Sequence, residues 1–551
     1  TLWSIVKAIS LYAILWAVLA LLVALEGEPF AMIPRSVVVM NWLLALIVVG
    51  GIRMMVRWLL SGFKDTKNKK NIVIYGAGSA GRQLSIALTQ SNEYLPVALL
   101  DDNYEIQGQS IYGLEVCSPD SLASLIKKKN VIEVFLAMPE LSRSRRNSIV
   151  DFITSYAVIV RSLPSVSELA QGKVKIEDLR EINIKDLLGR DPVSPNTKLL
   201  KTKINDKSVL VTGAGGSIGS ELCRQILLLK PKNLILFDVS ESSLYQIEQE
   251  LLGINSFNIN IFPMIGSVLD RIRMESIFKY FEVDTIYHAA AYKHVPLVEY
   301  NQSQGILNNA IGTLLTAETA IIAKVKTFVL ISTDKAVRPT NTMGATKRIA
   351  ELIIQALSQE VNQTSFTMVR FGNVLDSSGS VIPLFKKQIK NGGPLTITDK
   401  NIVRYFMTIS EAVELVIQAG AMNKGGDLFV LDMGEPVRIN DLAKKMIQLS
   451  GLKLRNDENP EGDIEIKYVG LRPGEKLYEE LLVSGVTSKT ENPLIMSARE
   501  KMIEWTILKP MLEELIEHAN KSDQQKIREM LIKIVPEYSP QSPIVDLLFK
   551  K

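Results

Sequence analysis

The sequence predicts an α/β protein in which two tandem Rossmann-like, doubly wound parallel sheets follow an N-terminal transmembrane helical hairpin. Two hydrophobic runs, at residues 8–25 and 37–52, predict the hairpin. A short apolar strand then leads into a glycine-rich turn at residues 76–81, and the same pattern restarts at residues 212–219. A strand, a glycine turn and a helix in this order begin a nucleotide-binding βαβ unit. The predicted domains are transmembrane helices at 1–63, a first Rossmann-like nucleotide-binding domain at 64–185, and a catalytic domain with a C-terminal cap and helical tail at 186–551.

Length and composition limit the classes of function. With 551 residues, 47% hydrophobic and 22% charged, the chain is long enough for two or three folded domains and a membrane segment. A formal net charge of +4 is small for this length, so no nucleic-acid binding is expected. Cys117 and Cys223 lie far apart and the three histidines are scattered, which predicts no metal site and a reduced, cytosolic body.

The two hydrophobic runs approach the length of about 17 to 25 residues that a membrane-spanning helix needs. Six basic residues follow the second run and place that end in the cytoplasm by the positive-inside rule. We therefore expect a multi-pass membrane protein with its catalytic domain in the cytoplasm and the lipid bilayer as a partner. The chain begins at Thr1, so earlier helices are expected to be missing. The alternative is a buried hydrophobic hairpin in a soluble protein. The basic residues are Arg53, Arg57, Lys64, Lys67, Lys69 and Lys70.

The first Rossmann-like unit begins with a predicted strand at 71–75 and the glycines Gly76, Gly78 and Gly81. The next strand, at 96–100, ends at Asp101, and another is predicted at 131–137. The rest of this domain carries no acid and base pair at a strand end. Two interpretations therefore stay open: the domain binds a nucleotide for regulation, or it keeps only the fold. Residues 174–196 are predicted to form a connector.

The second glycine turn carries a stronger signal. Gly213, Gly216 and Gly219 follow a strand predicted at 207–211, and Ser217 and Ile218 begin the helix whose free N–H groups would hold a pyrophosphate. The next predicted strand, at 233–237, ends at Asp238, which lies 238 − 219 = 19 residues beyond the last glycine. A carboxylate at about 20 residues accepts the adenine ribose hydroxyls, so this spacing favours NAD over NADP.

Further strands are predicted at 285–288, 327–331 and 367–371, and they alternate with helical stretches. This alternation predicts a parallel sheet with helices on both faces. The region after Gly372 is predicted to be a substrate cap, and residues 505–551 a helical tail. Three small residues follow the strand at 285–288 and would let the backbone approach a cofactor, with Lys293 and His294 as candidates for substrate contact. The three are Ala289, Ala290 and Ala291.

The main chemical clue is Thr333-Asp334-Lys335, directly after the strand at 327–331. Open α/β sheets place their chemistry at such strand ends. Downstream, Met343 and Lys347 share one face of a predicted helix. Short-chain dehydrogenases usually have a tyrosine where Met343 stands, and a thioether relays no proton. Acid and base work would then pass to Asp334 and Lys335, whereas the simpler interpretation is a solvated surface ion pair.

Polar residues of the later region are candidates for binding a diphosphate. Guanidinium groups form two parallel hydrogen bonds to phosphate oxygens, which suits Arg370, Arg404 and Arg472, with Asn373 nearby in sequence. Each arginine taken alone also fits a surface salt bridge. The prediction of a diphosphate site therefore depends on these residues taken together, not on any single arginine.

From residue 71 to about 480 and in the preceding hairpin, the chain resembles the membrane-bound nucleotide-sugar 4,6-dehydratases, which are extended short-chain dehydrogenases. Soluble short relatives keep the tyrosine, so Met343 places the resemblance with the long, membrane-anchored branch. The resemblance implies UDP-N-acetylglucosamine as substrate, tightly bound and recycled NAD, retained configuration at C5, and a homo-oligomer. The matching segments are 212–221, 288–296, 309–313, 332–336, 343–351, 370–374 and 472–476.

In the reaction that the resemblance implies, Lys335 is the base at C5 and Asp334 protonates the departing C6 hydroxyl. Thr333 hydrogen-bonds the C4 oxygen, and Lys347 holds the nicotinamide ribose. The acceptor of the C4 hydroxyl proton stays open. Three alternatives remain: a UDP-sugar 4-epimerase, a catalytically inactive membrane-tethered nucleotide sensor, and a membrane scaffold for glycan enzymes.

Overall fold

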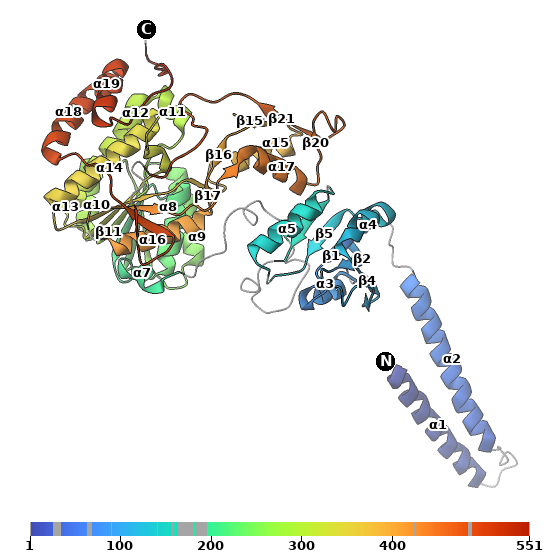
Figure 1. The fold of residues 1–551 in the computed structure, drawn as a ribbon. Helices are drawn as coiled ribbons and strands as arrows, with labels where there is room; N and C mark the ends of the chain where they lie inside the picture. The colour runs from blue at the N-terminus through green and yellow to red at the C-terminus, as the bar shows by residue number, and fades with distance from the viewer. Residues whose placement is uncertain are drawn as a thin grey trace.

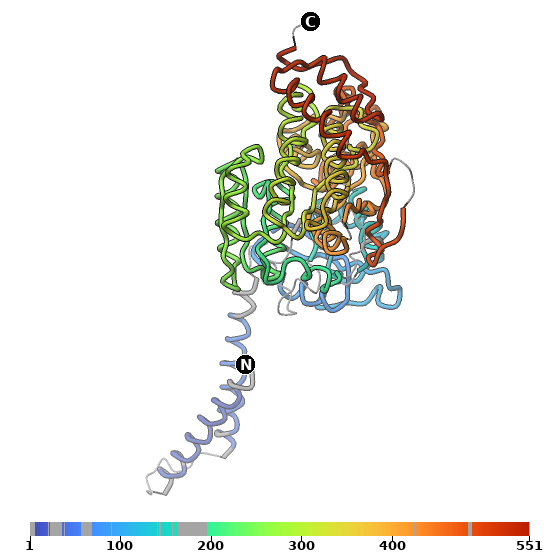
Figure 2. The backbone as a smooth tube through the Cα atoms, turned by 90° about the vertical axis from the view of Figure 1, so that its left-hand side faces the viewer, coloured from blue at the N-terminus to red at the C-terminus, as the bar shows by residue number. Residues whose placement is uncertain are grey.

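The computed structural model describes residues 2–25, 35–62, 69–89, 91–139, 141–156, 158–163, 180–181, 195–423, 425–482 and 487–549. Two helices, α1 (Leu2–Leu25) and α2 (Arg35–Gly62), lie side by side and project away from the rest of the molecule (Figures 1 and 2). Most of the predicted tether at 64–70 and of the connector at 174–196 lies outside the described residues.

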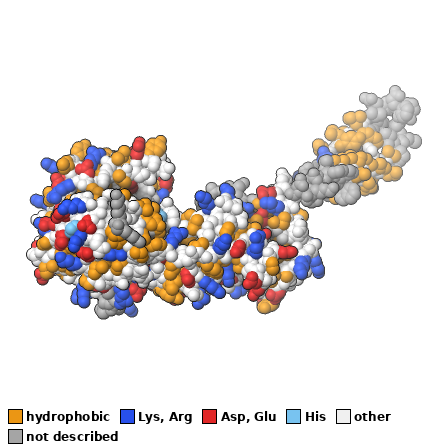
Figure 3. Space-filling view, turned by 90° about the horizontal axis from the view of Figure 1, so that it is seen from above, with side chains coloured by type: hydrophobic (Ala, Val, Ile, Leu, Met, Phe, Trp, Pro, Cys, Tyr) orange, Lys and Arg blue, Asp and Glu red, His pale blue; other side chains and the backbone are white. Residues whose placement is uncertain are grey.

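The hairpin has one helix of spanning character in the part of the chain that the structure describes. Val39–Val56 in α2 has a mean hydropathy of 1.9 and none of it is buried, whereas the side chains that the structure describes in α1 give a shorter apolar stretch, Val6–Leu19. Trp42 Nε1 donates a hydrogen bond of 3.1 Å to Ser10 Oγ between the two helices. Figure 3 shows hydrophobic side chains along this projection, while charged and hydrophobic groups are mixed on the visible face of the body. The structure therefore gives paired helices but only one candidate span, so the prediction of two is not supported.

The first sheet has seven strands in the order β3-β4-β2-β1-β5-β6-β7. Its central strands pair in parallel, and β3 and β7 pair antiparallel with β4 and β6 at the two edges. The strands predicted at 71–75, 96–100 and 131–137 correspond to β1, β2 and β5. The strands are β1 (Lys70–Tyr75), β2 (Tyr94–Leu100), β3 (Ser110–Ile111), β4 (Leu114–Cys117), β5 (Glu133–Leu136), β6 (Ile159–Ser162) and β7 (Arg180–Glu181), and the helices are α3 (Ser79–Thr89), α4 (Leu122–Lys129) and α5 (Arg143–Thr154).

The second sheet has nine strands in the order β10-β9-β8-β11-β12-β13-β18-β23-β22. The first seven of these are parallel, and β23 and β22 continue the sheet antiparallel. The chain direction across the sheet reverses between β8 and β11, and open parallel sheets bind ligands at this point. The strands are β8 (Ser208–Thr212), β9 (Asn233–Asp238), β10 (Asn260–Ile265), β11 (Thr285–His288), β12 (Thr327–Ile331), β13 (Ser365–Arg370), β18 (Asp427–Leu431), β22 (Thr487–Lys489) and β23 (Ile495–Ala498).

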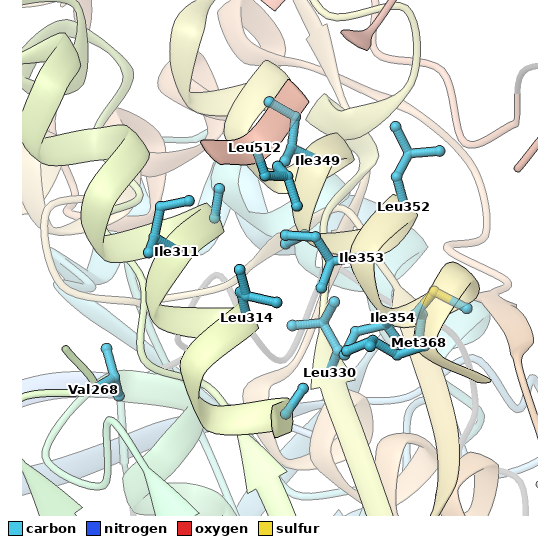
Figure 4. Close-up of a cluster of buried hydrophobic side chains, with 14 of the residues drawn as sticks. Val268, Ile311, Leu314, Leu330, Ile349, Leu352, Ile353, Ile354, Met368 and Leu512 are labelled. Atoms are coloured by element: carbon cyan, nitrogen blue, oxygen red, sulfur yellow. The ribbon is translucent and has the colours of Figure 1, made fainter. Parts of the chain in front are cut away.

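Helices cover both faces of this sheet, as predicted. Alternate residues of β12 point to opposite faces of the sheet. Phe328 and Leu330 belong to one hydrophobic core, and Val329 and Ile331 belong to the other. Figure 4 shows the first core, in which helix and strand side chains interdigitate. The helices of the first core are α10 (Arg271–Tyr280), α13 (Gly312–Ile322), α14 (Thr342–Glu360), α18 (Trp505–Lys521) and α19 (Gln524–Ile534), and those of the second are α7 (Thr197–Thr202), α8 (Ser217–Leu228), α9 (Glu241–Ile254) and α16 (Ile409–Met422).

A smaller lobe after Gly372 carries short strands and two helices. Its core is continuous with that of the first domain, and α5 lies beside α17 (Figure 1). Lys445 Nζ of α17 forms an ion pair of 2.6 Å with Asp151 of α5. The elements of the lobe are β14 (Asn373–Val374), α15 (Val381–Lys390), β15 (Leu395–Ile397), β16 (Val403–Arg404), β17 (Phe406–Met407), β19 (Val437–Arg438), α17 (Ile439–Leu449), β20 (Leu454–Arg455) and β21 (Ile464–Tyr468).

Three short helical elements lie on the chain between β11 and β12, and a fourth is a single turn after β12. They are α11 (Val295–Tyr300), α12 (Gln302–Ile306), η3 (Leu307–Ile311) and η4 (Asp334–Ala336). The predicted helical tail is helical only through α18 and α19, and residues 535–549 continue without a helix. Tyr538 packs in the core there, so this segment is fixed by burial.

Candidate active site

A cavity of about 900 Å³ opens where the carboxyl ends of β8, β11 and β12 meet the smaller lobe. Most of the predicted site residues line it, although they come from stretches up to 259 residues apart (472 − 213). Those that line it are Gly213, Gly216, Ser217, Ile218, Gly219, Ala289, Ala291, Lys293, His294, Thr333, Lys335, Met343, Lys347, Asn373, Arg404 and Arg472; Asp238, Ala290, Asp334 and Arg370 do not.

The glycine turn brings backbone close to backbone. Gly213 has φ +66°, and a Cβ there would lie 2.8 Å from the backbone nitrogen of Ala290. A Cβ on Gly219 would collide with the carbonyl oxygen of Gly213, so α8 packs tightly against the turn. The helix begins at Ser217, and its first residues line the cavity. Free N–H groups at this end suit the pyrophosphate of a dinucleotide.

Asp238 closes the same turn at the end of β9. Its Oδ2 accepts a hydrogen bond of 2.8 Å from Gly215 N, and its Oδ1 accepts one of 2.8 Å from Ser240 N. The carboxylate is partly exposed beside the glycine turn. This position fits a group that accepts ribose hydroxyls.

Small residues after β11 make room at the cavity wall. Ala289 and Ala291 line the cavity, whereas Ala290 faces Gly213 and its backbone nitrogen donates to Thr212 Oγ1 over 3.3 Å. His288, at the end of β11, is fully buried between Thr212 Oγ1 at 2.8 Å and Thr313 Oγ1 at 3.1 Å. Burial, reinforced by the charge of Lys347, lowers the pKa of His288 to about 3.

Lys293 and His294 also line the cavity. Burial lowers the pKa of both side chains, and the charge of Lys293 lowers that of His294 further. Gly379, with φ +71°, allows its loop to lie directly against the His294 ring, where a Cβ would clash. The cap loop therefore contacts the imidazole of His294, although this residue is otherwise exposed.

The turn η4 holds three predicted residues in contact. Asp334 Oδ1 accepts hydrogen bonds from Thr333 Oγ1 at 2.9 Å and from Lys335 Nζ at 3.0 Å. Thr333 and Lys335 line the cavity, while Asp334 is completely buried behind them. The hydrogen bonds of Thr333 and Lys335 therefore connect this buried carboxylate to the cavity wall.

Lys335 Nζ lies among oxygen atoms. Besides Asp334, it contacts Asn373 Oδ1 at 3.2 Å and Glu479 Oε1 at 3.7 Å. Burial lowers the pKa of Lys335, but the charges of Asp334 and Glu479 outweigh burial and the net direction is upward. The amine is therefore an ammonium at neutral pH in this state of the site.

Met343 and Lys347 lie on one face of α14, as the four-residue spacing predicts, and both line the cavity. Burial lowers the pKa of Lys347 to about 8, against the opposing charge of Glu351. The Asn341 side chain caps the helix by accepting from Gly344 N at 2.8 Å. A Cβ on Gly344 would collide with the carbonyl oxygen of Lys335, so this glycine lets α14 lie against η4.

The prediction that Arg370 binds substrate is not supported by its position. The side chain is fully buried behind the cavity. Its Nε donates to Glu351 Oε1 over 2.7 Å, and its Nη1 donates to Glu500 Oε1 over 2.6 Å. Arg348 joins the same cluster. Two carboxylates more than 100 residues apart already neutralise this guanidinium, which leaves none of its charge for a diphosphate.

The remaining polar candidates do reach the cavity. Arg404 Nη1 donates to two backbone carbonyl oxygens, and its Nη2 lies 3.4 Å from Glu475 Oε1. Arg472 is exposed at the rim, in a turn whose Gly474 carbonyl oxygen accepts from Thr340 and Asn341 at the start of α14. The turn therefore links the cap to the helix that carries Met343.

Two acidic residues near the site were missed by the sequence prediction. Glu475 lines the cavity and holds Arg404, and Glu479 lies behind Lys335. The sequence contained one signal, since both follow the Arg472 turn within eight residues (479 − 472 = 7). Nothing in the spacing showed that this stretch folds back onto η4.

The first glycine turn repeats one contact of the second. Ala77 N donates to Asp101 Oδ2 over 2.7 Å, as Gly215 N does to Asp238. The first turn is also tightly packed: a Cβ on Gly76 would lie 3.1 Å from the Ala137 carbonyl oxygen, and Met138 packs against the same position. A separate cavity of about 300 Å³ lies at the carboxyl ends of β1 and β2, lined by Tyr75, Asp102 and Arg145 among others.

Comparison with known proteins assigns the family. A family model described as "Polysaccharide biosynthesis protein" matches residues 209–500, which is more than half of the chain. The chain belongs to this family. Capsular polysaccharide biosynthesis protein CapD of Staphylococcus aureus is 43% identical over 486 residues, which cover 87% of this chain and 79% of the relative.

Two further relatives are similar to this chain over different lengths. Probable polysaccharide biosynthesis protein EpsC of Bacillus subtilis is 42% identical over 481 residues, covering 86% of this chain and 79% of the relative. A UDP-glucose 4-epimerase of Rickettsia bellii is 35% identical over 292 residues, covering 52% of this chain and 81% of that enzyme. The two polysaccharide biosynthesis proteins thus match along most of the chain, and the epimerase along about half of it.

Proposed function

We propose that this protein is an NAD-dependent lyase that removes water from UDP-N-acetylglucosamine and retains the C5 configuration. The product would be UDP-2-acetamido-2,6-dideoxy-4-keto-hexose, a precursor for bacterial glycan synthesis. One observation carries the proposal: Thr333 and Lys335 line the same cavity as Met343, which stands where a dehydrogenase would have its tyrosine, and both hydrogen-bond the buried Asp334 directly behind them. An acid and an amine in contact are the groups that elimination of water requires.

The cavity has the parts that a nicotinamide dinucleotide needs. The N-terminus of α8 would hold the pyrophosphate, Asp238 the adenine ribose, and Lys347 the nicotinamide ribose. When bound, NAD supplies the hydride acceptor at sugar C4 and the hydride donor at C6. Arg404 and Arg472 would then hold the UDP diphosphate at the cap side of the cavity.

The Thr333 hydroxyl offers a route for the C4 hydroxyl proton. Thr333 lines the cavity, and its Oγ1 already donates to Asp334 Oδ1 over 2.9 Å. A proton leaving the C4 oxygen would pass through this hydroxyl to the carboxylate behind it. Asp334 would then hold the proton that leaves with the C6 oxygen as water, so one proton serves both steps.

The rival within enzymes is a UDP-sugar 4-epimerase, and the 35% identity to the Rickettsia bellii protein favours it over unrelated activities. Met343 argues against it, because C4 oxidation in an epimerase relies on a phenol. An epimerase also has no use for an acid and an amine placed for elimination. An inactive nucleotide sensor or a scaffold would leave Asp334 and Lys335 dispensable.

Incubating the purified protein with UDP-N-acetylglucosamine and measuring the product mass tests these alternatives. A product lighter by one water supports dehydration; an isomer of unchanged mass indicates epimerisation; no reaction indicates a sensor or scaffold. Asp334→Asn and Lys335→Ala should each lower turnover by about 100-fold or more while NAD stays bound. Thr333→Ser should retain turnover that Thr333→Ala loses. Near-normal turnover of either Asp334→Asn or Lys335→Ala would contradict the assignment.

We also propose that the chain is held at the inner membrane with its catalytic domain in the cytoplasm, and that it acts as a homo-oligomer. The segment Val39–Val56 supports membrane attachment, because its apolar side chains have no protein partner that buries them. Arg53, near the C-terminal end of this segment, and Arg57, directly after it, suit the cytoplasmic side. Sedimentation of the detergent-extracted protein tests the oligomer, and a monomer that keeps full activity would contradict it.

A further inference from the structure

Glu479 is a buried acid that the reaction described above does not use. Its side chain is 4% exposed, and its Oε1 lies 3.7 Å from Lys335 Nζ. It does not line the cavity. Glu479 reaches Lys335 from a stretch 144 residues further along the chain (479 − 335), so only the tertiary fold brings the two together.

The three residues that surround Lys335 Nζ each keep a polar atom without a partner in the part of the chain that the structure describes. These buried atoms are Asp334 Oδ2, Asn373 Nδ2 and Glu479 Oε2. Leaving a buried polar group unpaired costs about 1 to 3 kcal/mol, so such atoms are rare unless they serve a function. Two of the three are carboxylate oxygens, each of which can still accept a proton beside the Lys335 amine.

The charges around Lys335 raise a problem for its role as a base. Two carboxyl groups, of Asp334 and Glu479, face one ammonium, and the nearest additional cation is Arg404, whose Nε lies 3.9 Å from Glu479 Oε1. Arg404 is itself shared with Glu475. A lysine held this way keeps its proton, and an ammonium has no lone pair with which to remove the C5 proton.

We propose that Glu479 is the positioning residue that takes the ammonium proton of Lys335 and so converts this lysine into a base. This inference rests on the dehydration proposed above. The Lys335 Nζ–H bond breaks and a Glu479 O–H bond forms, which leaves a neutral amine and a neutral carboxyl. Once Asp334 has received the C4 proton, its negative charge no longer favours the ammonium, so the transfer becomes easier at the moment when a base is needed.

The proton count closes around the cycle. The neutral amine of Lys335 takes the C5 proton, the C5–H electron pair forms the C5–C6 double bond, and the C6 oxygen leaves as water with the proton from Asp334. When hydride returns to C6, Lys335 gives its added proton back to C5. Glu479 then returns the stored proton to Lys335, and all three side chains regain their initial state.

Glu479→Gln tests the proposal, because the amide keeps the shape but accepts no proton. At pH 7 we expect kcat to fall by about 100-fold, with an unchanged KM for UDP-N-acetylglucosamine since Glu479 does not line the cavity. Raising the pH should restore kcat by about tenfold per unit, because solvent then removes the Lys335 proton. The kcat of the wild type should vary little over the same pH range. Glu479→Asp should retain most of the wild-type kcat.

The matched control is Glu480→Gln. Glu480 is the next residue, exposed and ion-paired with Arg338 at 2.9 Å, and its loss should leave the pH profile unchanged. An equal loss at every pH in Glu479→Gln would indicate a purely structural acid and overturn the proposal. Unchanged or faster turnover at pH 7 would also overturn it, since Glu479 would then only restrain the ammonium. If the wild type released no water, the proposed function itself would fail instead.

Discussion

At the residue scale, Lys347 and Met343 stand where a short-chain dehydrogenase usually has a lysine and a proton-transferring tyrosine. Burial lowers the pKa of Lys347 to about 8, so its side chain is mostly an ammonium at neutral pH. Among the described residues none accepts a hydrogen bond from its amine, which leaves these N–H groups for the cavity. Met343 beside it contributes an apolar surface without a transferable proton. In the proposed reaction, protons therefore move through Thr333, Asp334, Lys335 and Glu479 rather than through residue 343.

His288 gives a prediction about stability. Its folded pKa of about 3 lies below an unfolded value of about 6.5, so the unfolded chain binds an extra proton between these values. The contribution of His288 to the stability of the fold is therefore fully present above pH 6.5 and is lost as the pH falls. Lowering the pH from 7 to 5 should reduce the free energy of unfolding by about 2 kcal/mol through this one group. Denaturant unfolding of the catalytic domain at both pH values measures it.

His288→Gln provides the comparison for that measurement. The variant keeps a polar side chain between Thr212 and Thr313 but has no titration in this range, so its stability should fall less between pH 7 and pH 5. His294 is present in both proteins, and its contribution cancels in the difference. Equal losses in the two proteins would show that the His288 ring is not held neutral.

At the element scale, the contact between α14 and η4 decides whether Lys347 and Lys335 share one cavity. Gly344→Ala should destabilise the protein by about 1 to 3 kcal/mol, because the new Cβ meets the Lys335 carbonyl oxygen and lies 3.0 Å from Pro339 Cβ. Turnover should fall as well, since α14 must move away from the turn. Thermal unfolding and the water-loss assay measure the two effects.

Gly253→Ala is the control for that substitution. Gly253 lies inside α9, is exposed, and has no heavy atom within 4 Å of the position of a Cβ. Alanine there should stabilise the helix by up to about 1 kcal/mol without affecting turnover. Loss of activity in both variants, or in neither, would contradict the role given to the α14 contact.

The elements show what local sequence information predicts. The strands at 285–288 and 327–331 were predicted with their observed bounds, because a buried parallel strand is a short apolar run that ends at polar residues. The glycine turn and Lys335 were placed at the cavity by the rule that ligands bind at strand ends. Arg370 also ends a strand, yet its partners Glu351 and Glu500 come from distant segments. Long-range charge pairing of this kind leaves no local signal.

At the scale of the whole molecule, the described part of the first domain contacts the smaller lobe, where α5 lies beside α17. The exposed ion pair between Asp151 and Lys445 contributes at most about 1 kcal/mol. The shared hydrophobic core between the two parts contributes more, because apolar burial scales with area. Ile439 begins α17 and lines the large cavity, so α17 connects the first domain to the site. Sequence patterns predicted two nucleotide-binding folds but not this contact.

Membrane attachment is the prediction that concerns the whole molecule. The wild type should stay in the membrane fraction after a carbonate wash, because α2 presents apolar side chains such as Ile47, which is 71% exposed. Ile47→Arg combined with Leu44→Arg should move the chain to the soluble fraction, since each charge costs about 2.5 to 3.5 kcal/mol at the centre of a span. The control, Ile272→Arg, changes a 79% exposed residue of the catalytic domain and should leave the distribution unchanged. A wild-type chain that is soluble after cell lysis would mean that the α1–α2 pair packs against protein instead.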